Sequence, residues 1–440
     1  MWLLYEFLLC VGLLCYVPKA LWRKRLPHPG WSMRLGRYPA RVRRLMGARR
    51  AVWIHAVSVG EVMAMTPLID RLAAGGASRP LVVSTVTHTG FGVATRLVGD
   101  RGAVIYGPLD LRVVVRRALQ SIRPAMLILA ESEFWPLLIR GCRRQGIPVV
   151  VVNGRVSARA FPRYLLIKAV LRPTLHRIDR FLMQSDVDAQ RVIAMGAPPE
   201  RVTVVGSLKW DAGVMARPDP AQVQETARRL GLGPDDTVFV AGSTHRGEEE
   251  QVLAACSAVR VAHGRVRLIL APRHLERLEE VESLARRQGA VVMRASAPSL
   301  TSWDVLLVDA MGQLASYYAL ASVVFVGGSL IPHGGQNPIE PAVLGTPTVF
   351  GPFMHNFAEI AQQLVTHQAA VQLTDGATLA STLQQLLVDR AGAQAMGARA
   401  RALAERLAGA TQRTLEALQP LLGHGGEGSR EMGEGKRVYF

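Results

Sequence analysis

Carboxylates that could take a proton from a substrate follow two apolar stretches of the sequence. Glu61 comes after Gly60 at the predicted start of a helix, where it either offsets the helix dipole or accepts a proton from a hydroxyl group. The dipole favours the ionised carboxylate that a general base needs. Glu131 and Glu133 are two residues apart, so in an extended chain they point to opposite faces and form no obvious acid–base pair. Either one is otherwise explained as a buried carboxylate bound by backbone amides.

Two basic side chains are suited to hold a phosphate. Lys209 follows another apolar stretch and precedes Trp210; it either lies on the surface or stabilises a leaving phosphate. Arg273 also follows an apolar stretch, and its planar guanidinium can grip a phosphate with two hydrogen bonds. The adjacent His274, taken alone, is more typical of a structural histidine.

A glycine-rich stretch, VGGSLIPHGGQNPIEP at residues 326–341, joins a predicted buried strand to a helix expected to begin at or just after Pro338. Glycines let backbone amides approach a ligand closely, and a helix N-terminus attracts anions. Glu340 in the first turn either caps these amides or accepts hydrogen bonds from a ribose. The pattern fits a nucleotide-binding loop and a plain turn with a capping glutamate equally well.

The elements that must position these side chains belong to an α/β protein with two Rossmann-like halves. Continuous apolar strands that alternate with helices indicate parallel sheets covered on both faces, whose ligands meet the carboxyl ends of the strands. We also expect a ligand cleft between the halves. A Pro- and Asp-rich linker is predicted at residues 211–222. Strands are expected at residues 51–56, 81–86, 126–130, 149–152, 181–183 and 202–205, and then at 237–241, 266–271, 291–293, 305–308, 323–326 and 348–350.

Several classes of site are excluded or disfavoured by the motifs that the sequence lacks. It contains no P-loop, HExxH or GxSxG motif, so P-loop phosphoryl transfer and nucleophilic hydrolysis have no support. Its four cysteines form no CxxC pair, which fits a reducing cytosol rather than a disulfide framework or a zinc site.

The N-terminus and the charge indicate a membrane partner. Residues 1–22 are largely apolar and precede Arg23, Lys24 and Arg25, which predicts an uncleaved anchor with the main body on the cytoplasmic side. A cleaved signal peptide and a helix lying in the interface are the alternatives. The net charge of +18 favours polyanions, and without a nucleic-acid-binding motif we rank an anionic membrane surface above nucleic acid. The basic run after the anchor consists of Arg34, Arg37, Arg41, Arg43, Arg44, Arg49 and Arg50.

Taken together, the motifs resemble a known family. HAVSVGE, ESEFWP, NGRVSAR, GSLKWD, STHRGEE, PRH and GGSLIPHGGQNPIEP occur in one order along most of the chain. The set closely resembles the bacterial 3-deoxy-D-manno-octulosonic acid (Kdo) transferases of lipopolysaccharide synthesis. The resemblance implies an inverting GT-B glycosyltransferase that moves Kdo from CMP-Kdo to the lipid A precursor (lipid IVA) at the bacterial inner membrane. The expected regions are a membrane anchor with its basic flank at 1–25, an acceptor-binding domain at 26–212, a nucleotide-sugar-binding domain at 213–422 and a mobile tail at 423–440.

The resemblance also assigns roles to individual residues. It gives the general base to Glu61 and transition-state support to Glu131 and Lys209. Two positions depart from the family's usual pattern, because Gln313 stands in place of Glu and Gln336 in place of His, while the nearby His333 is not in register. The implied contacts to CMP are Pro272, Arg273, Met311, Gly312, Gln313, Asn337, Pro338, Ile339 and Glu340.

No cofactor or metal is expected. Asp186-Val187-Asp188 matches the Asp-x-Asp pair that holds a metal in glycosyltransferases of another fold, but here Ser185 is the expected N-cap of a helix. A CMP-sugar also has one phosphate rather than two for an ion to bridge. Two other functions stay open: a nucleotide-sugar epimerase of the same fold, and a membrane-tethered protein that binds polyanions.

Overall fold

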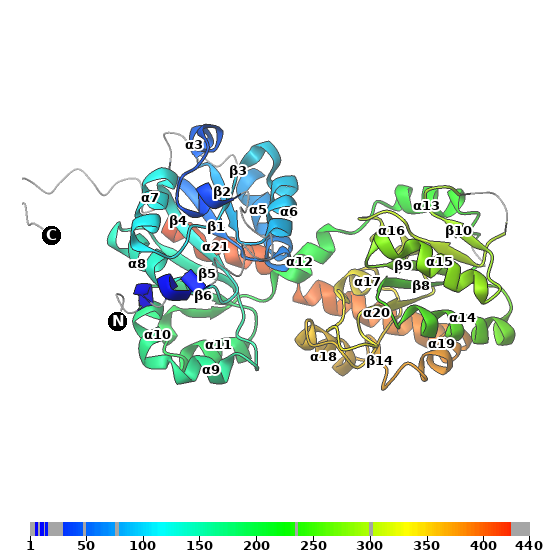
Figure 1. The fold of residues 1–440 in the computed structure, drawn as a ribbon. Coiled ribbons are helices and arrows are strands. Elements are labelled where there is room, and N and C mark those ends of the chain that lie inside the picture. Colours follow the sequence, from blue (N-terminus) through cyan, green and yellow to red (C-terminus); the bar gives the residue numbers. More distant parts are fainter. Residues whose placement is uncertain are drawn as a thin grey trace, which may run out of the picture. The chain divides into compact units, whose positions relative to one another are not determined.

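The computed structural model describes residues 5–7, 9–12, 14–15, 30–46, 50–74, 79–233, 236–298 and 302–423. Its contacts divide the chain into two compact units (Figure 1). Unit 1 comprises Met1–Ala212 and Gly409–Phe440, and unit 2 comprises Gly213–Ala408. Each unit contains a seven-stranded sheet in which the paired strands are parallel, so the predicted α/β class with two parallel sheets is confirmed.

The sheet of unit 1 has the strand order β3-β2-β1-β4-β5-β6-β7. Successive residues of a strand point to opposite faces, so Trp53 packs into the core on one face while Val52 and Ile54 pack into the core on the other. This two-sided burial explains why the strands are apolar throughout. The strand bounds are β1 Ala51–His55, β2 Leu81–Thr85, β3 Gly102–Tyr106, β4 Pro124–Ala130, β5 Val149–Gly154, β6 Arg180–Met183 and β7 Val202–Val204.

Helices cover both faces of this sheet. Buried side chains of α7, α8, α10 and α11 share one core with Trp53, and those of α4, α5, α6, α12 and α21 share the other with Ile54. The bounds are α2 Trp31–Arg34, α3 Ala40–Met46, α4 Val59–Ala64, α5 Thr66–Ala74, α6 His88–Val98, η1 Gly99–Arg101, α7 Arg112–Ile122, α8 Pro136–Arg144, α9 Phe161–Leu166, α10 Lys168–Leu175, α11 Asp186–Ala194, η2 Pro199–Arg201, α12 Leu208–Met215 and α21 Ala410–Gly423.

The sheet of unit 2 has the strand order β10-β11-β9-β8-β12-β13-β14. Its bounds are β8 Thr237–Thr244, β9 Val266–Pro272, β10 Val292–Arg294, β11 Val305–Leu307, β12 Val323–Val326, β13 Thr348–Phe350 and β14 Val371–Gln372. The helices are α13 Pro220–Arg229, α14 Glu249–His263, η3 Leu275–Arg277, α15 Leu278–Arg287, α16 Leu314–Leu320, α17 Ile339–Leu344, α18 Ala358–Thr366, α19 Leu379–Val388 and α20 Arg390–Leu407.

Two edge strands and one domain boundary differ from the sequence-based expectation. The edge strands β3 and β14 were not predicted. The assignment of residues 213–422 to one domain is wrong at its end, because α21 packs into the core of unit 1. Asp211 fixes this return of the chain: its carboxylate accepts hydrogen bonds from the backbone N–H groups of Gly409 and Thr411, each at 2.6 Å.

The predicted anchor and tail lie largely outside the described residues. Residues 5–7, 9–12 and 14–15 are helical, but the rest of 1–29 and all of 424–440 are not described. No helix among the described residues has the length and apolar character to cross a bilayer. The membrane anchor and the mobile tail therefore stay predictions.

Candidate active site

Glu61 folds back over the start of its own helix. Ser58 is the N-cap of α4, and its Oγ accepts a hydrogen bond from the backbone N–H of Glu61 at 3.3 Å. In return the Glu61 carboxylate accepts from Ser58 Oγ at 2.9 Å and from the backbone N–H of Val57 at 2.8 Å. This is a variant of the capping box of S-x-x-E sequences, in which the carboxylate accepts from the N–H of Val57 rather than from that of the N-cap residue. The carboxylate is thereby held in one orientation just beyond β1.

The protonation of Glu61 differs from the expectation based on the helix dipole. Burial, together with the nearby carboxylates of Glu133 and Glu131, raises the pKa of Glu61 to about 7, against the opposing effect of the Val57 N–H group and Ser58. The expectation that the helix dipole keeps Glu61 ionised is therefore met only in part, because a carboxylate with this pKa is partly protonated at neutral pH. A pKa close to neutral pH suits a general base better, because it balances the ionised fraction against proton affinity.

Glu131 and Lys209 form an ion pair across the carboxyl edge of the sheet. Lys209 Nζ lies 3.2 Å from Glu131 Oε1, and both side chains are about four-fifths buried, with 19% and 21% exposure. Glu131 has a φ of +53°, so the chain leaves its extended conformation directly after β4. The prediction that Glu131 and Glu133 point to opposite faces assumed an extended strand, and the chain is not extended there. Both carboxylates instead lie close enough to Glu61 to raise its pKa.

Sequence reasoning missed the contacts that join Glu133, Trp135 and His55. The Nε1–H group of Trp135 donates to Glu133 Oε2 at 2.9 Å, and the Trp135 ring packs edge-on against the buried ring of His55, 4.7 Å between centroids. Burial raises the pKa of Glu133, and Glu131 adds to the rise. His55 Nδ1 pairs with Ser84 Oγ at 2.7 Å. The E-S-E-F-W spacing was the available signal for this cluster.

Asn153 positions the helix that carries Lys209. It is buried at the end of β5 with a φ of +55°, and its Oδ1 accepts from the backbone N–H of Leu208 at 3.0 Å. Its backbone carbonyl accepts from Gln184 Nε2 at 2.8 Å. The asparagine of the NGRVSAR motif thus fixes the start of α12, one residue before Lys209.

In unit 2 the structure brings together Arg273 and the start of α17. The exposed Arg273 follows β9 and Pro272, and its backbone N–H donates to the carbonyl of Thr244 at 2.9 Å. Burial raises the pKa of Glu340, while Asn337 and the positive charge of Arg273 lower it.

Helix α17 begins at Ile339, directly after Pro338, as the sequence predicted. Asn337 Nδ2 donates to Glu340 Oε1 at 3.1 Å, and Asn337 Oδ1 accepts from the backbone N–H of Ile339 at 3.1 Å. Asn337 therefore orients the Glu340 carboxylate, the group predicted from the sequence as a possible acceptor for a ribose.

Met311, Gly312 and Gln313 lie in the turn after β11. Met311 is 61% exposed, and Gly312 has a φ of +86°, which favours glycine. The Gln313 side chain is engaged within its own helix, since Tyr317 Oη donates to Gln313 Oε1 at 3.1 Å. The Gln313 carbonyl oxygen therefore contributes to the first turn of α16.

The glycine-rich loop is held by a carboxylate that sequence reasoning overlooked. Buried Glu248 accepts hydrogen bonds from four backbone N–H groups: His245 at 2.9 Å, Gly328 at 2.7 Å, and Ser329 and Leu330 at 2.9 Å each. The amides of residues 328–330 are therefore satisfied within the protein and are not free for a ligand. Gly327 allows the loop to touch β8, where an added Cβ would lie 2.5 Å from the carbonyl oxygen of Ser243.

Gln336 meets a histidine cluster. Its Nε2 lies 3.1 Å from His245 Nε2, and the His333 and His274 rings lie with their centroids 4.0 and 5.5 Å from that of His245. Burial, together with the neighbouring His333 and His274, Arg273 and Arg277, lowers the pKa of His245 to about 4. His245 is therefore neutral at pH 7, and an amide at position 336 can pair with it.

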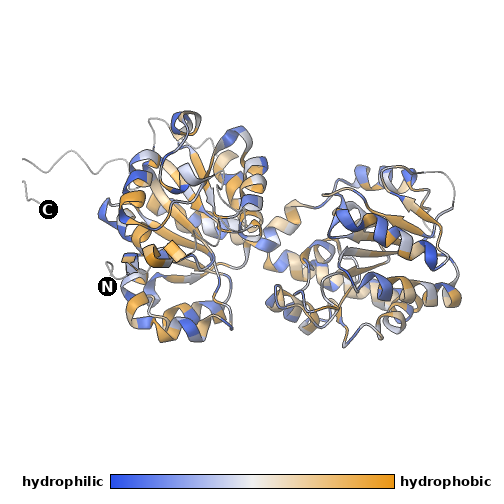
Figure 2. Cartoon of the chain, viewed as in Figure 1, coloured by the Kyte–Doolittle hydropathy of each residue, from blue (hydrophilic) through white to orange (hydrophobic). Residues whose placement is uncertain are grey.

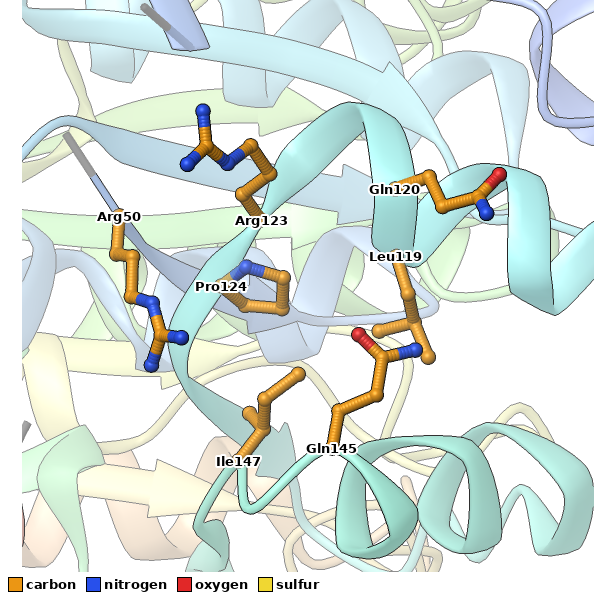
Figure 3. Close-up of a pocket in the computed structure, with 7 residues that line it drawn as sticks. All are labelled: Arg50, Leu119, Gln120, Arg123, Pro124, Gln145 and Ile147. Carbon is orange, nitrogen blue, oxygen red and sulfur yellow. The ribbon is translucent and has the colours of Figure 1, made fainter. Parts of the chain in front are cut away.

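A surface depression in unit 1 lies at the other edge of the sheet (Figure 3). Arg50 precedes β1, Pro124 opens β4 and Ile147 precedes β5, so the depression adjoins the amino ends of the strands. All the site residues of unit 1 follow carboxyl ends, so this depression is separate from them. It is lined by Arg50, Leu119, Gln120, Arg123, Pro124, Gln145 and Ile147.

The Asp186-Val187-Asp188 match opens a helix. Ser185 is the N-cap of α11, as predicted, and its Oγ donates to Asp188 Oδ2 at 2.7 Å. Asp188 is buried and also accepts from the backbone N–H of Val156 at 2.7 Å. Across the residues that the structure describes, no group of three or more His, Cys, Asp or Glu side chains is arranged to hold a metal ion.

Comparison with known proteins places this arrangement in a family. The family model for 3-deoxy-D-manno-octulosonic-acid transferase (kdotransferase) matches residues 29–212. The 3-deoxy-D-manno-octulosonic acid transferase of Bordetella pertussis is 36% identical over 419 residues, which is 92% of this chain and 95% of that protein. The enzyme of the same name from Haemophilus influenzae is 32% identical over 376 residues, covering 85% of this chain and 87% of that protein.

Solved structures show the fold. The crystal structure of a UDP-GlcNAc 2-epimerase from Neisseria meningitidis bound to UDP-GlcNAc superposes with a TM-score of 0.59 at 11% identity, covering 84% of this chain and all of that one. At this identity the likeness establishes the two-unit α/β architecture alone.

Proposed function

The chain belongs to the family of Kdo transferases, and we propose that it moves Kdo from CMP-Kdo to the lipid A precursor lipid IVA with Glu61 as the general base. Membership makes it a glycosyltransferase. The observation that carries the assignment of the base is the oriented Glu61 carboxylate, with its pKa raised to about 7 by burial and two neighbouring carboxylates.

In the proposed step, an acceptor hydroxyl oxygen attacks the anomeric carbon of Kdo. The bond between that carbon and the phosphate oxygen of CMP breaks, and CMP leaves with the bonding electrons. The hydroxyl proton passes to Glu61. Inversion follows from a single displacement. Lys209, held by Glu131, stabilises negative charge that develops as the bond to phosphate lengthens.

Unit 2 supplies the proposed donor site. Arg273 suits the single phosphate of CMP, and Glu340, oriented by Asn337, suits the ribose. Pro272, Met311, Gly312, Gln313, Pro338 and Ile339 are the further contacts that the family resemblance implies. Gln336 keeps a hydrogen-bonding amide against His245 where the family usually has histidine.

We place the enzyme at the bacterial inner membrane, with an N-terminal anchor and both units on the cytoplasmic side. The support is the apolar stretch at residues 1–22 and the positive charge of Arg23, Lys24 and Arg25 directly after it.

The test is incubation of the purified full-length chain with CMP-Kdo and tetra-acylated lipid A precursor, with mass analysis of the lipid. A mass increase of one or more Kdo residues, with release of CMP, is expected. A changed nucleotide sugar without transfer would favour the epimerase alternative, which shares the fold. No reaction together with tight, salt-sensitive nucleic-acid binding would favour the polyanion-binding alternative.

A further inference from the structure

A short turn of unit 2 carries Arg273, the side chain proposed for the phosphate of CMP. The turn leaves β9 at Pro272 and continues into the three-residue helix η3, Leu275–Arg277. Polar residues begin where the apolar strands end, and Figure 2 shows the strands of this sheet largely in hydrophobic orange. A single turn of 3₁₀-helix has poor hydrogen-bond geometry, so contacts from outside must fix its position.

Arg277, the last residue of η3, is held by a buried carboxylate. Its Nη1 donates to Glu249 Oε1 at 2.8 Å, and its Nη2 donates to Glu249 Oε2 at 3.3 Å. Glu249 is fully buried, and the Arg277 side chain is only 14% exposed. A charge-assisted contact through two parallel hydrogen bonds fixes direction as well as distance. The end of η3 is therefore held in one orientation against the first residue of α14.

The positive charge of Arg277 is balanced within this network. Its Nη2 also donates to Glu280 Oε1 at 3.3 Å, and Glu280 Oε2 accepts from Arg246 Nη2 at 2.5 Å. A guanidinium group that faces two carboxylates adds little positive potential at a phosphate beyond them. We therefore expect Arg277 to act on the donor site by placing the turn, and not through its charge.

Two further contacts tie the turn to the same segment of the chain. The backbone N–H of Arg273 donates to the carbonyl of Thr244, the last residue of β8, at 2.9 Å. The His274 ring packs edge-on against the ring of His245, with centroids 5.5 Å apart and an interplanar angle of 76°. With the contact at Arg277, the segment that joins β8 to α14 touches the turn at three places.

The same segment also holds the glycine-rich loop. Glu248, the neighbour of Glu249 in the sequence, accepts hydrogen bonds from the backbone N–H groups of residues 328–330. Two adjacent buried carboxylates therefore hold the two pieces of chain that we assign to the donor. Glu248 binds the glycine-rich loop, and Glu249 binds the turn that carries Arg273.

We propose that the Glu249–Arg277 ion pair positions Arg273 for the phosphate of the donor. Glu249 and Arg277 are then positioning residues that do not touch the donor themselves. Accurate placement matters because an error of about 1 Å in the position of a binding group can lower the rate by about 10²-fold. The role of Arg273 toward the phosphate rests on the proposed function, whereas the placement of the turn by Glu249 does not.

Removal of both charges together tests the positioning without leaving one charge buried and unpaired. Glu249→Met with Arg277→Met keeps long side chains, and apolar replacement of a buried ion pair often preserves stability. The matched control is another buried ion pair of unit 2, in which Arg267 Nε lies 3.3 Å from Asp236 Oδ1 near the amino ends of β8 and β9. Asp236→Asn with Arg267→Met removes the charges there.

Hydrogen exchange of the full-length protein without ligand tests the placement of the turn. The Glu249→Met, Arg277→Met variant should exchange the amides of residues 273–277 about tenfold faster than the wild type, and the control variant should not. Unchanged exchange of this segment in the folded variant would overturn the proposal.

Calorimetry with CMP tests the effect on the phosphate site. The Glu249→Met, Arg277→Met variant should bind CMP about tenfold more weakly or worse, and the same change in an Arg273→Ala background should have little further effect. Equal losses in the two backgrounds would overturn the proposal, because they would show damage that does not act through Arg273.

A milder variant keeps the test decisive if the double methionine variant does not fold. Glu249→Asp retains the charge but shortens the reach of the carboxylate toward Arg277. It should also weaken the binding of CMP, and this effect should again disappear in the Arg273→Ala background. Binding of CMP by Glu249→Asp with the affinity of the wild type would overturn the proposal.

Failure of the proposed function gives a different result. Wild-type protein that neither binds CMP nor transfers Kdo would contradict the proposed function, while hydrogen exchange still decides whether Glu249 places the turn. Wild-type protein that binds CMP, together with a double methionine variant that binds it equally well, would contradict the positioning alone.

Discussion

Lys209 Nζ lies 3.2 Å from Glu131 Oε1, which joins the start of α12 to the end of β4 at the carboxyl edge of the unit 1 sheet. Both side chains are about four-fifths buried, so the cost of removing the two charges from water offsets much of their attraction, and the pair itself is weak evidence for stability. The pair holds the ammonium group in place next to Glu131, one of the carboxylates that act on Glu61.

Replacing Lys209 should lower turnover. Lys209→Met should lower the kcat of the folded protein by roughly 10²-fold, the effect of losing one electrostatic partner of the transition state. Glu131→Gln should lower kcat through the same ammonium group, so the double variant should lose much less than the sum of the two effects. Strictly additive losses in this double-mutant cycle would argue against the pair acting as a unit.

The pH dependence of kcat/KM should depend on the carboxylates around Glu61. Since the base must be ionised, kcat/KM should rise with pH and level off above about pH 7, the pKa of Glu61. The negative charge of Glu133 raises that pKa, so Glu133→Gln should shift the rising limb to lower pH. Glu200→Gln, a change at an exposed site, should leave the limb in place. A limb that moves to higher pH in Glu133→Gln would contradict the geometry.

Glu248 should keep the glycine-rich loop in its ordered conformation. Glu248→Gln exchanges one acceptor oxygen for an N–H₂ group that faces backbone donors, which should destabilise the protein by about 2–4 kcal/mol and raise the KM for CMP-Kdo more than that for the acceptor. Glu250→Gln, an exposed change on the same helix α14, is the matched control. Denaturant unfolding and initial rates measure the two effects. An unchanged KM for CMP-Kdo in a destabilised variant would show that Glu248 stabilises the fold without affecting donor binding.

Transfer should persist in excess EDTA. Asp188 serves the start of α11 and the Val156 amide, so Asp186→Asn with Asp188→Asn should lower the melting temperature while leaving kcat close to that of the wild type. Activity abolished by chelator, restored by Mg²⁺ or Mn²⁺ and absent in the double variant would mean that the pair binds a metal.

The sequence predicted what depends on local pattern. Buried parallel strands, the capping residue Ser185 and the start of α17 after Pro338 follow from residues within one turn of one another. The strands β3 and β14 were not predicted because edge strands are only partly buried and have weaker apolar runs.

Relationships between distant residues could not be predicted in this way. The apolar pattern of α21 shows that the helix packs, but not that Asp211 draws its start back to unit 1. The helix dipole at Glu61 is a local effect, whereas the pKa of Glu61 is set by burial and by the carboxylates of Glu133 and Glu131. The hydrogen bonds from the glycine-rich loop to Glu248 likewise join residues eighty positions apart.

The most direct measurement of the central claim is the turnover of Glu61→Gln with CMP-Kdo and lipid A precursor. Glutamine keeps the size of the side chain and can still accept from the Val57 amide, but it cannot take up the hydroxyl proton. We predict a loss of about 10²–10⁴-fold in kcat, with melting temperature and CMP-Kdo binding close to those of the wild type. Near-normal turnover of the folded variant would show that another group, or none, removes the proton.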